Sequence, residues 1–315
     1  MVGEMFTFKN RDGIEIFVYK WLPEPKTKIK AVVQIVHGGA EHAGRYAHVG
    51  EALAKAGYAV YADDHRGHGK TGQNMGRLGK LGPGDWEGMV QDLKELTDII
   101  KKDYPGLPIF LLGHSMGSLL AQCYIQNWGN ELRGVLLTGT TGEPLKLPAG
   151  IDLGSVQRLI EEKGLDAPAE EFSELTKAFN EPFQPAKTGF EWLTRDEAEV
   201  QKYIDDPLSG FAFSYGSLIE LAKGMFAIGD PQKLQRIPKN LAIYIFVGSM
   251  DPASGMGKGA EALFKRFKEL GIKDVTFKVY LGGRHELFNE INSCLLYTSD
   301  AADDLLCVDL GGRRI

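Results

Sequence analysis

Residues 108–117 read Pro-Ile-Phe-Leu-Leu-Gly-His-Ser-Met-Gly, a short apolar run that leads directly into the pattern Gly-x-Ser-x-Gly. Such a run is typical of a buried parallel strand, and residues 118–125 continue in a pattern that favours a helix. Between a strand and a helix this pattern forms a tight turn that presents its serine on a strained backbone. Glycine is needed on both sides because a Cβ atom would not fit there. The stretch therefore predicts a strand-turn-helix unit with Ser115 as a candidate nucleophile.

Two further apolar runs end beside the residue types that a nucleophilic serine requires. Asp251 follows the run at 241–248, and His285 follows the run at 275–281. Serine is a poor nucleophile until a base accepts its proton, and the usual base is a histidine oriented by a carboxylate. The order Ser, Asp, His at three strand ends predicts a triad of Ser115, Asp251 and His285. Two alternatives stay open, with Asp251 as the N-cap of the next helix and His285 as a turn residue.

The backbone N–H groups that would stabilise a negatively charged oxygen in acyl transfer can also be assigned. One belongs to the residue after the nucleophile, Met116, and the other to the loop after an earlier strand. That loop follows the apolar run at 31–36, and we assign the second N–H to Gly39, with Ala40 as the alternative. Residue types cannot separate these two because only backbone atoms take part.

Apolar runs and helical patterns alternate along most of the chain. The predicted strands lie near residues 31–36, 58–62, 108–112, 133–138, 241–248 and 275–281, separated by helices such as 86–103 and 258–270. Two alternating stretches around the turn Asn10-Arg11-Asp12-Gly13 predict an antiparallel hairpin at the edge of the sheet. The pattern predicts an α/β protein with a mostly parallel sheet of eight strands flanked by helices.

One long interval, residues 141–237, breaks this alternation with several prolines, many charges and helical patches such as 169–179 and 218–226. An insertion at this point of such a sheet is expected to cover the active site. We therefore divide the chain into a core, residues 1–140 and 238–293, and a cap segment, residues 141–237.

Three stretches are specific enough to be compared with known proteins. They are His37-Gly38-Gly39-Ala40-Glu41-His42 with Gly44-Arg45-Tyr46, then Asp63-Asp64-His65-Arg66-Gly67-His68-Gly69, and the Gly-His-Ser-Met-Gly turn. Together they resemble the monoacylglycerol lipase and lysophospholipase family of serine hydrolases, over the chain up to about Asn292 and least in its middle. The resemblance implies the α/β-hydrolase fold, an acylglycerol or lysolipid ester as substrate, no cofactor, and the same triad and oxyanion groups. It also implies that the second stretch is a structural loop, and we expect no metal.

Candidate substrate contacts come from two places. Glu41 and His42, beside the oxyanion loop, either contact a polar headgroup or hold the fold. In the cap segment, Phe183, Phe211 and Phe213 either line an acyl pocket or belong to the cap's own small core. The sequence alone does not decide between these alternatives.

Composition limits the compartment and the partners. The 315 residues are 43% hydrophobic, which is enough for one large core or a core with a subdomain. The net charge of −6, without a basic stripe, argues against a nucleic-acid partner. Three cysteines and an N-terminus without a leader-like apolar run lead us to expect a cytoplasmic protein. The oligomeric state stays open, and transient contact of the cap segment with a membrane surface would suit a lipid ester.

The end of the chain has an unusual sequence. Residues 294–315 resemble a translated sequencing adaptor, so we leave them out of the fold and expect the natural chain to continue past Asn292. The alternative is an amphipathic C-terminal helix, although Gly311-Gly312 and a weak periodicity argue against it.

Several other functions compete with the ester hydrolase. Another carboxylesterase or a peptidase could use the same triad, and an inactive scaffold could keep the fold. A complete triad argues against the scaffold, and Ser115 stands where epoxide hydrolases and dehalogenases need an aspartate. For a serine hydrolase we expect activity to rise with pH near the ordinary pKa of histidine, about 6.5, because His285 must be neutral.

Overall fold

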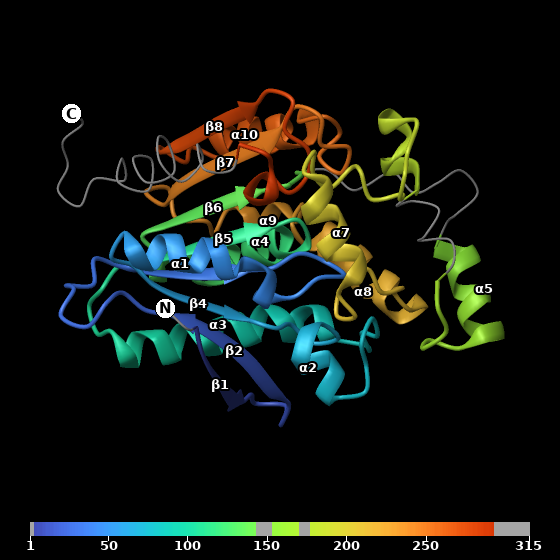
Figure 1. Cartoon of the computed structure of the whole chain (residues 1–315). Helices are drawn as coiled ribbons and strands as arrows, with labels where there is room; N and C mark the ends of the chain where they lie inside the picture. Colours follow the sequence, from blue (N-terminus) through green and yellow to red (C-terminus); the bar gives the residue numbers. More distant parts are fainter. Residues whose placement is uncertain (1–2, 143–152, 170–176, 293–315) are drawn as a thin grey trace.

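One sheet organises the computed structural model, which describes residues 3–142, 153–169 and 177–292 (Figure 1). In these ranges eight strands are ordered β1-β2-β4-β3-β5-β6-β7-β8. They are β1 (Glu4–Lys9), β2 (Glu15–Trp21), β3 (Val32–Val36), β4 (Ala59–Asp63), β5 (Ile109–His114), β6 (Gly134–Thr138), β7 (Ala242–Gly248) and β8 (Val275–Tyr280). β2 pairs antiparallel with β1 and β4, and the other pairs are parallel. The predicted fold class is confirmed, and the strand ends fall within two residues of those predicted.

Helices cover both faces of the sheet. Those of the core are α1 (Ala47–Lys55), α2 (Gly69–Asn74), α3 (Asp85–Asp103), α4 (Met116–Trp128) and α10 (Lys258–Glu269). α1 packs on one face, while α3, α4 and α10 pack on the other. Every residue of the central strands β3, β4, β5 and β6 is consequently buried, which explains why these strands read as continuous apolar runs.

The carboxyl ends of the parallel strands meet at one edge of the sheet. β5 ends at His114, β7 at Gly248 and β8 at Tyr280, in register through β6. The loops that follow them carry the three predicted triad residues. Parallel strands open their ligand sites at this edge.

The cap segment lies between β6 and β7 and contributes α5 (Leu153–Lys163), α7 (Glu197–Asp205), α8 (Tyr215–Ala227) and α9 (Pro231–Leu234). In Figure 1, α7 and α8 lie beyond one end of the sheet, with α5 farther out. Two small apolar clusters belong to this segment, one around Ala169 and Tyr215, the other around Trp192, Leu193 and Tyr203. The second cluster also takes in Ala253 of the predicted core, and the division of the chain at residues 141 and 237 stays a prediction. The predicted patch at 218–226 is part of α8, whereas 170–176 lie outside the described residues, as does the tail at 294–315.

Helix α8 is bonded to the core by buried side chains. Ser217 accepts the N–H of Leu81 at 2.8 Å and donates to the carbonyl of Gly79 at 2.7 Å. Glu220 accepts the N–H of Trp86, in the first turn of α3, at 2.9 Å. A carboxylate at a helix N-terminus satisfies a free N–H and stabilises the helix dipole.

No helix in the described ranges combines the length and the apolar character that crossing a bilayer requires.

Candidate active site

Ser115 occupies the turn between β5 and α4 with φ 52° and ψ −121°, a strained conformation for any residue but glycine. The flanking glycines allow this turn. A Cβ at Gly113 would lie 2.6 Å from the carbonyl oxygen of Gly117, and one at Gly117 would lie 2.1 Å from that of Val36. The Ser115 residue is partly exposed, although its neighbours on both sides are buried. The turn therefore presents one hydroxyl from an otherwise buried unit.

Asp251 and His285 are brought together by the loops after β7 and β8. The Nδ1–H of His285 donates to Oδ1 of Asp251 at 2.9 Å, and both residues are buried. The same oxygen accepts the N–H of Ala253 at 3.0 Å. Helix α10 begins only at Lys258, preceded by Gly257 as its N-cap residue, so Asp251 does not cap it. The pairing leaves Nε2 of His285 as the nitrogen that can accept a proton.

Charge and burial set the protonation of this pair. Burial opposes the imidazolium, but the Asp251 carboxylate outweighs it and raises the pKa of His285 above its ordinary value. Burial likewise opposes the carboxylate, and His285 lowers the pKa of Asp251. His114, whose ring lies 4.7 Å from that of His285, has its pKa lowered to about 4 by burial and by His285. A neutral His114 therefore does not compete for the proton.

The two backbone groups assigned to the oxyanion hole lie near each other. Met116 is the first residue of α4, where N–H groups have no partner within the helix. A Cβ on Gly39 would lie 3.7 Å from Cβ of Met116 and 3.2 Å from Cζ of Phe213. Ala40, the alternative, has φ 54°, and its carbonyl accepts the N–H of Gly210 at 2.9 Å.

The side chain of His37 fixes the peptide group that joins Gly38 to Gly39. Nε2 of His37 accepts the backbone N–H of His65 at 3.0 Å, so the proton lies on Nδ1, which donates to the carbonyl of Gly38 at 2.7 Å. In a trans peptide the carbonyl and the following N–H point in opposite directions. Fixing the Gly38 carbonyl therefore fixes the direction of the Gly39 N–H.

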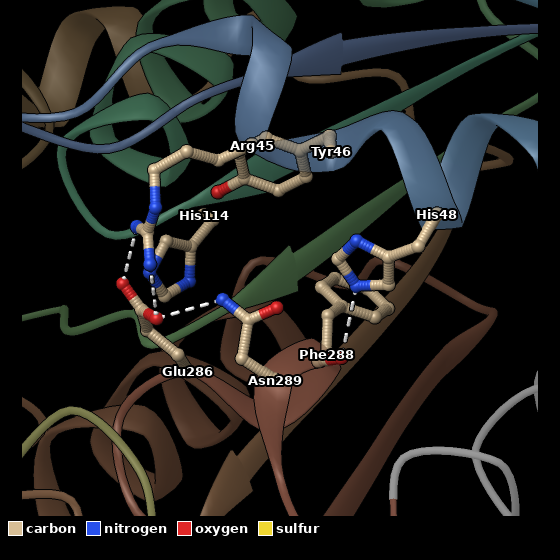
Figure 2. A pocket seen from close by; sticks show the side chains of 7 residues that line it. All are labelled: Arg45, Tyr46, His48, His114, Glu286, Phe288 and Asn289. Atoms are coloured by element: carbon tan, nitrogen blue, oxygen red, sulfur yellow. Dashed lines mark hydrogen bonds and ion pairs between the residues drawn. The ribbon is translucent and has the colours of Figure 1, made fainter. Parts of the chain in front are cut away.

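A buried ion-pair cluster joins the oxyanion loop to the loop of His285 (Figure 2). Glu41 accepts the N–H of Gly38 at 2.5 Å and pairs with Arg45 at 2.7 Å. Arg45 also donates to both oxygens of Glu286, at 2.6 and 2.8 Å. Burial opposes the Glu286 carboxylate, but Arg45 lowers its pKa to about 2. The pairing of Arg45 with Glu286 was not predicted, because no local pattern marks these residues as partners.

The side chains predicted to contact the substrate mostly bond to or pack against other residues of the protein. Glu41 is buried in the cluster just described, and Nε2 of His42 lies 2.7 Å from Oδ2 of Asp206 in the cap segment. Cζ of the Arg284 guanidinium lies over the Phe183 ring, 4.3 Å from the ring centroid. Phe213 borders Gly39, whereas Phe211 packs edge-on against Phe213 at 5.8 Å. Among the three phenylalanines, Phe213 is the one that borders Gly39 of the oxyanion loop.

The histidines of the stretch at residues 63–69 make contacts within the protein. Nδ1 of His65 lies 2.9 Å from Oδ2 of Asp63, and Nδ1 of His68 lies 2.9 Å from the carbonyl of Arg66. The ring of His65 stacks on His37 with 3.8 Å between centroids. Across the described residues, no group of three or more His, Cys, Asp or Glu side chains is arranged to hold a metal ion. The stretch supports the loop that carries Gly39.

Comparisons with known proteins identify the family and bear out the fold. A family model described as serine aminopeptidase, S33 matches residues 27–292. The monoacylglycerol lipase of Mycolicibacterium smegmatis is 29% identical over 291 residues, which cover 90% of each chain. The monoglyceride lipase of Homo sapiens is 30% identical over 284 residues, covering 90% of this chain and 83% of that relative. A highly thermostable carboxyl esterase from Bacillus coagulans, a solved structure, gives a TM-score of 0.85 at 31% identity, with 97% of each chain covered.

Proposed function

The chain belongs to the serine aminopeptidase S33 family of α/β-hydrolases, together with the monoglyceride lipases, and from this membership we propose that it cleaves carboxylic esters of monoacylglycerol or lysophospholipid type through an acyl-enzyme at Ser115. The observation that carries the proposal is the combination of a strained serine after β5 with a buried Asp251–His285 pair after β7 and β8. An ester hydrolase needs these three groups at one edge of the sheet.

The proposed reaction has two halves, acylation of Ser115 and hydrolysis of the acyl-enzyme, and the triad and the oxyanion hole act in both. Nε2 of His285 takes the proton of Ser115 Oγ while that oxygen attacks the ester carbonyl carbon, and the alcohol then leaves with the proton. Asp251 keeps the Nδ1 proton in place and stabilises the imidazolium. The N–H groups of Gly39 and Met116 stabilise the negative oxygen of the tetrahedral intermediate. Water repeats the sequence on the acyl-enzyme and releases the acid.

Two observations support the lipid-ester substrate. Relatives that match over most of their length are named as lipases of monoglycerides. In this chain, Phe213 places an aromatic ring against Gly39, so an apolar surface borders the oxyanion loop. An acyl chain next to the reacting carbonyl would lie against such a surface.

A peptidase that binds a free amino terminus is the second candidate, because the matching family model is described as a serine aminopeptidase. Such an enzyme needs a carboxylate that is free to bind an ammonium group. Glu41 and Glu286 lie beside the catalytic groups, but both are buried and paired with Arg45. This pairing favours the esterase, and aminoacyl 4-nitroanilides should be hydrolysed much more slowly than 4-nitrophenyl esters.

Labelling with a fluorophosphonate probe tests the proposal. The probe should label the wild type and not Ser115→Ala, and monoacylglycerols should compete in a manner that depends on chain length. Ser118→Ala is the matched control: Ser118 is a buried serine in the first turn of α4, and its hydroxyl bonds to the carbonyl of Ser115 rather than facing the substrate, so its loss should leave labelling in place. The kcat of Ser115→Ala on esters should fall by at least about 10⁴-fold. A folded wild type that is not labelled would favour the inactive scaffold.

A further inference from the structure

The loop that carries His285 is bonded to the cap segment by its main chain. The backbone N–H of His285 donates to the carbonyl of Trp192 at 3.3 Å, and that of Glu286 donates to Leu193 at 2.7 Å. The triad base thus depends on the inserted segment as well as on β8.

The residue before the base extends this contact. The guanidinium of Arg284 donates to the carbonyl oxygens of Glu191 at 2.6 Å and Thr194 at 3.1 Å. The carbonyls of four consecutive cap residues, 191–194, therefore all accept hydrogen bonds from three consecutive residues, 284–286. Arg195 adds an ion pair to Glu290 at 2.7 Å. So many bonds between two short segments make them one rigid unit.

The side chain of Trp192 contacts the imidazole itself. Its ring centroid lies 4.9 Å from that of His285, with the planes inclined by 39°. Trp192 is 9% exposed, and its N–H on the backbone donates to Oδ1 of Asn180 at 2.9 Å. The cluster around Trp192 also includes Ala253, two residues after Asp251. The indole therefore packs against His285, and the cluster to which it belongs reaches the loop of Asp251.

We propose that Trp192 is a positioning residue for the catalytic base, and that residues 191–194 make the orientation of His285 depend on the cap segment. An imidazole held only through Nδ1 can still swing about that hydrogen bond. A flat ring packed beside it restricts the swing and keeps Nε2 directed at the nucleophile. The inference rests on the proposed function, because it assumes that His285 is the base.

Kinetics on a small soluble ester, 4-nitrophenyl butyrate, give the first test. Trp192→Ala should lower kcat on the order of 10- to 100-fold, with a smaller change in KM, because a misplaced base slows the chemical step. Trp192→Phe keeps a ring beside the imidazole and should recover most of the loss. Phe190→Leu is the matched control, since Phe190 belongs to the same cluster but packs on Tyr203. It should keep kcat near the wild-type value.

Tryptophan emission gives a second readout, which tests the contact between the indole of Trp192 and the imidazole of His285. An imidazolium quenches an adjacent indole, so emission should rise with pH over the same range as kcat/KM. Of the four tryptophans, Trp192 is the one with a histidine ring against it among the described contacts. The titration should disappear in Trp192→Phe and in His285→Gln.

Other ionisable groups near the base do not confuse this titration. The charged or titratable groups that face His285 are Asp251, His114, Glu286, Glu41 and Arg284. The pKa of His114 is lowered to about 4 and that of Glu286 to about 2, and the pKa of Asp251 is also below its ordinary value. An emission change with a midpoint above about pH 6.5 therefore reports on His285, whose pKa is raised mainly by Asp251 against the opposing effect of burial.

The outcomes separate the inference from the function on which it rests. An active wild type with Trp192→Ala as fast as Phe190→Leu would overturn the inference and leave the esterase in place. An emission titration that survives in Trp192→Phe would overturn it as well. A wild type that hydrolyses no ester, but keeps the titration, would remove the proposed function and with it the base that Trp192 is proposed to position.

Discussion

His68, in the stretch that supports the oxyanion loop, allows a quantitative prediction of how the free energy of unfolding changes with pH. Its ring is fully buried, 5.3 Å from that of Phe211 and 5.7 Å from that of Phe213. Nδ1 is engaged by the carbonyl of Arg66, and Nε2 has no partner among the described residues. Burial lowers the pKa of His68 to about 3. The folded protein therefore excludes a proton that the unfolded chain accepts.

The sign and the size of the effect follow from the two pKa values. In the unfolded chain a histidine binds its proton near pH 6.5. As pH falls from there towards about 3, only the unfolded chain gains this proton, so stability decreases across the window. Each pH unit is worth about 1.4 kcal/mol, and lowering the pH from 7.5 to 5.0 removes about 2 kcal/mol through His68.

Urea unfolding of His68→Asn at these two pH values measures that contribution. Asparagine keeps an N–H near the Arg66 carbonyl but does not titrate, so the variant should lose about 2 kcal/mol less than the wild type. His65→Asn is a control of opposite sign. Burial opposes its charge, but Asp63 raises the pKa of His65, so this proton stabilises the folded state in acid. His65→Asn should therefore lose more than the wild type, and equal losses in wild type and His68→Asn would refute the reasoning.

Three further predictions concern the site. The kcat/KM profile should rise with pH through a midpoint above about 6.5, because the carboxylate partner of His285 outweighs burial and raises its pKa, and only the neutral base accepts a proton. Gly38→Ala should lose more activity than Gly39→Ala in a comparison of kcat. A Cβ at Gly38 would lie 2.7 Å from the buried Glu41 carboxylate and 3.1 Å from Cβ of Ser115, whereas the nearest atom to one at Gly39 belongs to the Phe213 ring, at 3.2 Å. Arg45→Met should lower the free energy of unfolding by about 3–5 kcal/mol, because two buried carboxylates lose their partner. Urea unfolding checks this, with little change expected for Lys187→Met at an exposed ion pair.

The sheet was predictable because its signals are local. Buried parallel strands appear as continuous apolar runs, and Ser115, Asp251 and His285 each follow such a run directly. The pairing of Asp251 with His285 follows from parallel strands that end at one edge of the sheet. Local patterns therefore fix both the fold and the order of the candidate triad.

The contacts that hold the site were not predictable in the same way. Arg45 and Glu286 are 241 residues apart, and nothing near either residue identifies the other. The bonds between Leu193 and the His285 loop join backbone atoms, which every residue type provides. For Phe213 the apolar character is evident from the residue type, but the direction of its side chain is not. These features depend on how distant segments meet, which a single sequence does not record.

The bonds of α8 to the core limit where this protein can be recombined with its relatives. A chimaera that exchanges the whole of residues 141–237 also replaces Ser217 and Glu220, the side chains that bond α8 to the core. The buried N–H groups of Leu81 and Trp86 would then lack their hydrogen-bond acceptors, unless the donor segment supplies equivalent side chains. An exchange that ends before Ser214 leaves those acceptors in the recipient. Replacing the outer part of the insertion, while α8 stays with the recipient chain, is then the exchange that keeps this junction intact.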